Sequence, residues 1–449
     1  MFWKRLIHLF ANGNKKNSQQ LLFPLRLGRY SDAFPAPEQL ELREQALDAF
    51  AQRDYLTAYW HFFASLRDEE EDNVRLAFYP EIQRLDFEIF QGSKVVTGYA
   101  SPKEVVGEVR VLRAPQLHVA LSRRLMEMNH GLLYSCFSLN ADQVICMRFS
   151  TQSGDGYPDK IYSGLREIAI TADRHDDLLL HEFAILEQLD TQHIQHLSDQ
   201  ERQHKVHFFQ NSLAHLQKNI QYWQTIDAGG AVSYLILAWV YSTDYLLTPE
   251  GPLLNHLEKI QQIYFEHPQQ KALWKNAKMQ EALKPLERLT PEAIAQNFYA
   301  VKATFGTAPR LSSSQWQQFC QKYLQTLDWC TQNQQREQAQ TVVAFMAGYA
   351  LFHFGMPLFL RALMHLILQV FHEDFLSQLR DDHTPIYDTK SGQLVPRNLQ
   401  LRLQLVLENA HEEGFSPPLD VAALSRHTSR EELGQSIFSM LRQGDWGLN

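Results

Sequence analysis

The feature that most constrains the fold is a change in the spacing of apolar residues along the chain. Within residues 85–113 and 131–150, apolar and polar residues alternate, as in the run from Leu85 to Ile89. That period of two is typical of strands with one buried face. After residue 190, apolar residues recur at helical spacing instead. The sequence therefore predicts an α+β fold, with an antiparallel sheet and its helices followed by a large all-helical region.

Turn residues and helix-start signals set the expected order of elements. Residues 40–190 read as helix, three strands, helix, two strands, helix, which is a sandwich of an antiparallel sheet and helices. Three segments follow from this order: an amphipathic segment and linker over 1–36, an α+β module over 37–190, and an all-helical region over 191–449 with a sub-boundary near 285–310. Helices are expected in the last segment near 199–226, 230–247, 252–266, 268–284, 291–305, 314–333, 336–353, 357–380, 398–412 and 429–442, with a short hairpin at 386–395.

One passage of the module is similar to a known family. Residues 121–149 read LSRRLMEMNHGLLYSCFSLNADQVICMRF, in which a helix ends at Met-Asn and two strands follow. Together with the element order of residues 40–190, this resembles the YbjN-like and type III secretion chaperone-like domains. The resemblance implies a non-enzymatic module that dimerises or holds extended segments of client proteins, and it supplies no catalytic residues. The helical region lies outside the pattern.

The sheet of the module provides the candidate partner-binding residues. Phe87, Ile89, Val109 and Val111 alternate along two expected strands and share one face of the sheet. We expect helices to cover this face. If these side chains were exposed in the monomer, they would mark a dimer or client surface. An edge strand of such a module can also accept an extended segment by strand addition.

The first ten residues, MFWKRLIHLF, form a candidate membrane contact. The apolar side chains that share one helical face are Phe2, Trp3, Leu6, Ile7 and Phe10. Lys4, Arg5 and His8 lie opposite, which is typical of a basic amphipathic helix at a lipid headgroup region. The segment lacks the features of a signal peptide. Packing on the protein's own body is the alternative to membrane contact through residues 1–16.

The stretch 175–215 is rich in histidine. His193 with His196, and His204 with His207, are spaced three apart, which places two imidazoles on one helical face. A metal-dependent enzyme built on this stretch is therefore an alternative function. No helical metal signature is complete, so we predict no metal and no cofactor. The nearby Asp173 and Asp177 are one helical turn apart and read as an exposed acidic patch rather than as catalytic carboxylates.

The charge and the cysteine content of the chain restrict the class of partner and the cellular compartment. The net charge of −9 is spread over both signs without a basic stripe, which argues against nucleic acid as a partner. The four cysteines form no C-x-x-C pair and favour reduced thiols in a cytoplasmic protein. A location at the inner face of the membrane is the alternative that the first sixteen residues leave open.

The most apolar stretch is Thr341–Leu360, which contains no formal charge over about the length of a membrane span. Gly355 and Pro357 interrupt it, so two buried core helices that meet at a Gly-Met-Pro turn explain it better. The whole pattern therefore predicts a non-enzymatic intracellular adaptor or chaperone-like protein that binds a protein partner, or a second copy of itself. A metal-dependent enzyme and a peripheral membrane scaffold are the alternatives.

Overall fold

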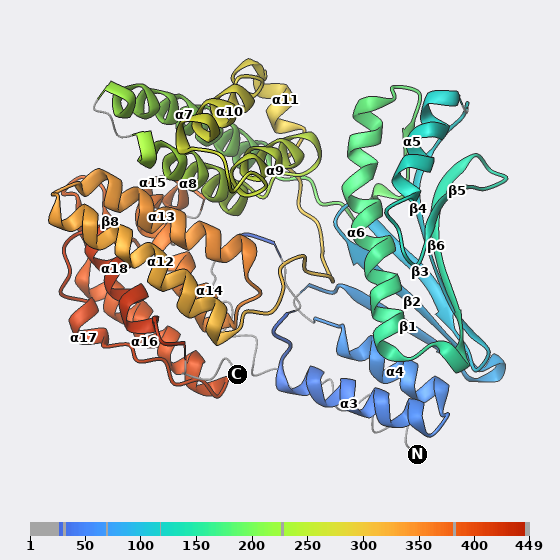
Figure 1. The fold of residues 1–449 in the computed structure, drawn as a ribbon. Coiled ribbons are helices and arrows are strands. Elements are labelled where there is room, and N and C mark those ends of the chain that lie inside the picture. The colour runs from blue at the N-terminus through green and yellow to red at the C-terminus, as the bar shows by residue number, and fades with distance from the viewer. Residues whose placement is uncertain are drawn as a thin grey trace.

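The computed structural model describes residues 27–29, 33–68, 71–116, 118–225, 229–379 and 383–444. They form two parts that stand side by side (Figure 1). One is an α+β module that runs from the first described helix to the end of the long helix α6. The other is an all-helical part that begins after residue 198. The predicted fold class is thus confirmed.

The module is organised around a sheet of seven strands in the described part of the chain. The spatial order is β1-β2-β3-β4-β6-β5, all antiparallel, and β7 pairs with one end of β4. The strands are β1 (Val74–Tyr79), β2 (Arg84–Gln91), β3 (Lys94–Ala100), β4 (Glu104–Arg113), β5 (Cys136–Leu139), β6 (Val144–Gln152) and β7 (Glu187–Gln188). Strand β1 was not predicted, so the first run contains four strands rather than three.

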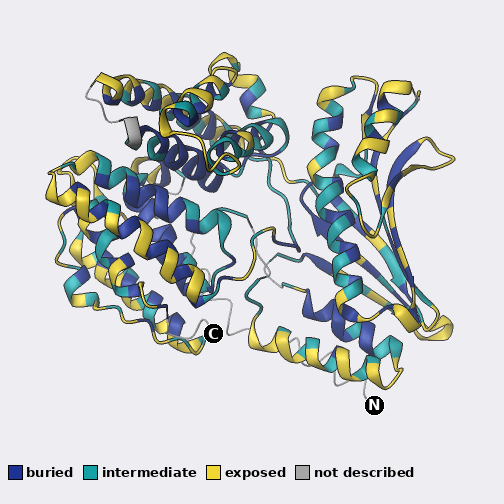
Figure 2. Cartoon of the chain, in the orientation of Figure 1, coloured by how far each residue is buried: buried dark blue, intermediate teal, exposed yellow. Residues whose placement is uncertain are grey.

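Helices cover one face of this sheet, as predicted. They are α3 (Pro37–Ala51), α4 (Tyr55–Ser65), α5 (Val119–Asn129) and α6 (Pro158–Glu182), and they lie on one side of the strands (Figure 1). Alternate strand residues point into the layer between sheet and helices and form one core with Phe62, Leu121 and Leu165. The opposite face carries exposed charged residues such as Arg75, Glu88 and Arg148. Figure 2 shows exposed positions along the strands of the sheet. The helices therefore cover one face of the sheet, while the other face is partly exposed and has buried positions such as Phe90 and Cys146.

The long helix α6 packs directly on the sheet because its apolar residues recur at helical spacing. Ile161, Leu165 and Ile168 are fully buried against the strands. Gly164 allows the closest approach, since a methyl group built at this position would lie 2.3 Å from ring atoms of Phe149 on β6. A residue without a side chain is therefore required where α6 crosses β6.

The helical part contains a second, separate core. Its elements are α7 (Asp199–Thr225), α8 (Gly229–Leu247), α9 (Gly251–Phe265), α10 (Ala272–Leu283), α11 (Pro291–Ala295), α12 (Ser313–Gln332), α13 (Arg336–His353), α14 (Leu358–Phe371), α15 (Glu373–Ser377), α16 (Pro396–Glu412), α17 (Val421–Leu424) and α18 (Arg430–Leu441), with a hairpin of β8 (Tyr387–Asp388) and β9 (Gln393–Leu394). The hairpin and most of the helices match the predicted ranges.

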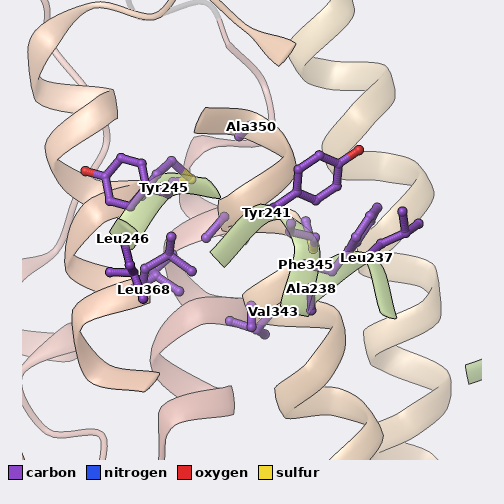
Figure 3. Close-up of a cluster of buried hydrophobic side chains, with 14 of the residues drawn as sticks. Leu237, Ala238, Tyr241, Tyr245, Leu246, Val343, Phe345, Ala350 and Leu368 are labelled. Atoms are coloured by element: carbon purple, nitrogen blue, oxygen red, sulfur yellow. The ribbon is translucent and has the colours of Figure 1, made fainter. Parts of the chain in front are cut away.

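Helix α8 is the centre of this core. Apolar side chains surround it on almost every side, which is typical of a helix buried by its neighbours. Figure 3 shows Tyr241 and Tyr245 of α8 among side chains of α13 and α14, including Phe345 and Leu368. The apolar stretch that starts at Thr341 forms α13 and α14 in this core, so the prediction of two core helices is confirmed.

The close approach of α6 and β6 makes a testable prediction. Gly164→Ala forces the new methyl group into the Phe149 ring. Overpacking of this kind costs about 1–3 kcal/mol, of which the better helix propensity of alanine offsets up to roughly 1 kcal/mol. We therefore expect a lower free energy of unfolding in urea. Gly154→Ala is the control, because nothing lies within 4 Å of a methyl group there. Equal stability of the two variants would contradict the packing described for α6.

Candidate functional site

The two parts meet at a junction made by three elements: the β2–β3 hairpin tip (Gln91–Lys94), the acidic side of α6, and the segment 300–306. The segment was predicted to be the end of a helix over 291–305, and that prediction is wrong beyond α11. It is extended instead, and its main chain bridges two loops of the chain. The Gly92 amide donates to the Lys302 carbonyl at 2.8 Å, and Gln195 exchanges two main-chain hydrogen bonds with Ala300.

Side chains then fix the segment to the module. The Gln91 side-chain oxygen accepts hydrogen bonds from the amides of Thr304 and Phe305, at 3.2 and 2.8 Å. The Thr304 hydroxyl donates to the Phe90 carbonyl at 3.0 Å. Phe305 is only 2% exposed and belongs to the module core, where its ring meets that of Tyr162 edge to face. The helical part therefore contributes one anchoring residue to the core of the module.

The hairpin tip carries a buried ion pair. Lys94 is 1% exposed, and its ammonium lies 2.9 Å from a carboxylate oxygen of the fully buried Asp176 on α6. The ammonium also donates to the Val111 carbonyl at 2.8 Å, and the Ser93 hydroxyl donates to Asp176 at 2.6 Å. These hydrogen bonds satisfy both charges, which an ion pair removed from water requires. Burial nevertheless raises the pKa of Asp176 to about 6.

A second carboxylate of α6 supports the turn of the hairpin. Asp173 accepts a hydrogen bond of 2.8 Å from the Ser93 amide. Gly92 has a φ of +56°, and a methyl group at this position would overlap the Asp173 carboxylate. Burial raises the pKa of Asp173 well above its ordinary value, and the nearby charges of Glu250 and Asp176 raise it further. Asp173 therefore holds its proton more strongly than a solvated aspartate does.

The helical part presents its own charged groups to α6. Arg29 donates to Glu250 at 2.7 Å and to Asp244 at 3.2 Å, and it also contacts the Pro249 carbonyl. Burial raises the pKa of Glu250, although the Arg29 charge opposes the shift. The Tyr299 hydroxyl donates to the Asp177 carboxylate on α6 at 2.6 Å.

Two hollows lie at the junction. A cavity of about 50 Å³ lies beside Arg29, Tyr241 and Asp244, which is room for water-sized molecules. A polar hollow of about 290 Å³ is lined by residues that include Asp72, His193 and Lys302. The carboxylates of the junction are hydrogen-bonded to donors within it, so the arrangement is suited to holding the two parts of the chain together.

A different surface lies at the α5–β5 end of the module. Its exposed large apolar side chains, named here the α5–β5 patch, are Val119, Met126, Leu133, Tyr134 and Leu139. Fifteen such side chains are exposed over the described residues, and a third of them fall within this short passage. Leu133 is the most exposed of all, at 86%. Concentrations of this kind mark interaction surfaces more often than scattered apolar residues do.

The loop that carries Leu133 is held in place by Glu167 on α6. The Glu167 carboxylate accepts hydrogen bonds from the amides of Leu133 and Tyr134, at 2.7 and 2.8 Å, and from the Ser135 hydroxyl at 2.8 Å. The exposed leucine therefore projects from a fixed loop. A partner that covers it does not need to order the loop first.

Strand addition at β5 is restricted by Asn129, the last residue of α5. Its side-chain amide donates to the Phe137 carbonyl at 3.1 Å and accepts from the Phe137 amide at 2.6 Å. These are main-chain groups that an added strand would use at the centre of β5. Asn129 thus protects the edge, as natural sheets commonly do, and a partner at the α5–β5 patch would contact side chains instead.

The structure places the predicted partner-binding residues in the core. Phe87, Ile89, Val109 and Val111 are at most 2% exposed and face the helices of the module. The cover of helices that we expected over this face is therefore present, and a partner-binding role of these four residues stays a prediction. The predicted membrane-contact residues Phe2, Trp3, Leu6, Ile7 and Phe10 lie outside the described residues.

The histidines of 175–215 are dispersed rather than gathered. His193 hydrogen-bonds the Gly92 carbonyl, and His204 bonds the Phe375 carbonyl and stacks on its ring. His215 is within hydrogen-bonding distance of Asn219. Among the described residues, no three His, Cys, Asp or Glu side chains are arranged to hold a metal ion. Asp173 and Asp177 lie partly buried at the junction and do not form the expected exposed acidic patch.

One feature of the sequence, a lysine at an inward-facing strand position, indicates the ion pair of the junction. Lys94 occupies the same strand face as Val96 and Ala100, both of which are fully buried. A lysine at an inward position of a strand requires an acidic partner on the covering helix. Combined with Asp173 and Asp176 on the predicted helix, that rule would have pointed to the ion pair.

Comparisons with known proteins leave the family open. No protein family, curated protein or solved structure matches the chain. In the part of the chain that the structure describes, there is no helix both long and apolar enough to cross a membrane.

The buried ion pair makes a prediction about stability. Lys94→Met removes the cation and leaves Asp176 buried without its charged partner, which typically costs about 3–5 kcal/mol. Urea unfolding should show this loss, and the double change Lys94→Met with Asp176→Leu should recover part of it. Lys103→Met is the control at an exposed position, with an expected change within about 0.5 kcal/mol. A loss below about 1 kcal/mol for Lys94→Met would contradict the account of this pair.

Proposed function

We propose that the chain is a non-enzymatic interaction protein that binds a protein partner through the α5–β5 patch of its α+β module. The observation that carries the proposal is Leu133, 86% exposed on a loop that three hydrogen bonds to Glu167 hold in place. Exposure of a large apolar side chain costs free energy in water, and covering it on binding recovers that cost.

The surroundings of Leu133 support a protein partner. Met126 on α5 is 72% exposed, and methionine adapts to partner surfaces of varied shape. Leu139, at the end of β5, and Tyr134, in the loop before β5, belong to the same patch. Strand β5, CFSL, contains no charged residue, so no charge on this strand opposes contact with an apolar partner surface.

The resemblance to YbjN-like and type III secretion chaperone-like domains points in the same direction. It implies binding of a client or a second copy without enzymatic activity. The protection of Phe137 by Asn129 favours a partner that presents apolar side chains over one that adds a strand to β5. A reducing cytoplasmic location agrees with the four free cysteines, one of them exposed.

Site-directed photo-crosslinking in cells tests the proposal. A photoreactive phenylalanine analogue at position 126 should give a defined adduct, whose mass identifies either a second copy of the chain or another protein. Leu133→Asp should reduce that adduct at least tenfold, because a charge placed in the patch opposes burial. Leu133 is exposed, so this change should leave the unfolding midpoint unaltered.

The matched control is position 273 on α10, where Leu273 is 74% exposed but isolated from the module. The analogue at 273 should give no comparable adduct. Equal adducts at 126 and 273, or an adduct at 126 that Leu133→Asp does not reduce, would refute the assignment of the patch.

A further inference from the structure

The junction between the two parts contains more acidic than basic side chains. Five carboxylates lie within it, three from α6 and two from the helical part, against two cations from the hairpin tip and the 27–29 segment. The carboxylates are Asp173, Asp176, Asp177, Asp244 and Glu250, and the cations are Lys94 and Arg29. With every group ionised, the junction would carry uncompensated negative charge in a partly dehydrated space.

Four of the carboxylates have a strong donor. Asp176 pairs with Lys94, Asp244 and Glu250 share Arg29, and Asp177 accepts the Tyr299 hydroxyl.

Asp173 differs from the other four. Over the described residues its direct partners are the amide and the hydroxyl of Ser93, at 2.8 and 3.3 Å, and both are neutral. Glu250 and Asp176 repel its ionised form, and Arg29 attracts it less strongly. Asp173 is therefore the carboxylate whose charge the junction balances least.

The other charged groups near Asp173 form ion pairs with other residues or are neutral. Lys302 pairs with Asp72 at 2.7 Å, and Arg174 pairs with Glu258 at 2.6 Å. The His193 ring contacts the Gly92 carbonyl, and burial lowers the pKa of His193, so its charge is absent above neutral pH. Burial also raises the pKa of Tyr299, which stays neutral there.

We propose that this junction is a proton-dependent joint between the module and the helical part, tight when Asp173 carries a proton and loosened when Asp173 is ionised. Ionisation places a negative charge beside Glu250 of the helical part and beneath the hairpin turn at Gly92. The hairpin tip holds the segment 300–306 through Gly92 and Gln91. Repulsion at Asp173 therefore acts on the same turn that fastens the two parts.

The direction of the effect follows from linkage. The pKa of Asp173 is higher in the folded junction than in the unfolded chain, so the folded state binds the extra proton. The contribution of Asp173 to the stability of the junction is fully present below its pKa in the unfolded chain. That contribution is lost as the pH rises through its pKa in the folded junction. Asp176, with a pKa of about 6, has already ionised at pH 7. The response that Asp173→Asn abolishes is therefore assigned to Asp173, whose ionised form the facing Glu250 opposes.

Hydrogen exchange of the segment 300–306 measures the joint directly, because the amides of Thr304 and Phe305 are bonded across it. Exchange is followed by mass spectrometry on the full chain, and rates are corrected with a synthetic peptide of the same segment. We expect protection in the wild type to fall at least tenfold as the pH rises through the titration of Asp173. Asp173→Asn keeps an oxygen that can accept from Ser93 and removes the charge, so its protection should stay high throughout.

Asp190→Asn is the control, since Asp190 pairs with Arg110 at the surface and should leave the wild-type response intact. Ser93→Ala provides a second variant if Asp173→Asn does not fold. It removes the one hydroxyl that lies within hydrogen-bonding distance of both Asp173 and Asp176, so the fall in protection should move to higher pH. Constant protection in the folded wild type, or an unchanged response in Asp173→Asn, would overturn the proposal.

Discussion

The structure depends on the insertion of Phe305 into the core of the module. This side chain follows α11 of the helical part, yet it is buried with Tyr162 under the sheet. Complete burial of a phenylalanine contributes about 1.5–3 kcal/mol. The amides of Thr304 and Phe305 bond to Gln91, so the anchor and the hairpin tip fix each other. Through this contact, two separate hydrophobic cores become parts of one folded chain.

The charged groups of the junction follow from that anchor. The segment 300–306 runs past the hairpin tip, and the acidic side of α6 faces the helical part. Asp173 and Asp176 of α6 are thereby enclosed at the junction. Burial of the Lys94–Asp176 pair adds little net stability compared with apolar residues of the same size. A pair of this kind does specify one arrangement of hairpin and helix, because any shift would leave a charge unpaired.

Much of the module could be predicted from local pattern. The alternation around Phe87 and Val109 correctly indicated strands with a covered face. The helix pattern of Thr341–Leu360 indicated core helices. Strand β1 was missed because only Arg75 interrupts the apolar run from Val74 to Phe78, so its alternation appears in burial rather than in residue type.

Apart from the Lys94–Asp176 pair, the contacts of the junction could not be predicted from local pattern. These contacts join residues far apart in the chain, such as Ser93 with Asp173, 80 positions away, and Asp177 with Tyr299, 122 positions away. The predicted helix over 291–305 failed for the same reason. Apolar residues continue past Ala295 at acceptable spacing, but tertiary hydrogen bonds to Gln91 and Gly92 hold the chain extended there. The α5–β5 patch also depends on Glu167, whose role only the folded loop reveals.

Differential scanning calorimetry of the wild type and of Phe305→Ala tests the central claim most directly. If Phe305 couples the two cores, the wild type unfolds in one transition with a calorimetric enthalpy close to the van't Hoff enthalpy. Phe305→Ala should then separate the unfolding into two transitions, one for each part. Two transitions in the wild type, or a single cooperative transition in Phe305→Ala that is only shifted to lower temperature, would contradict the account.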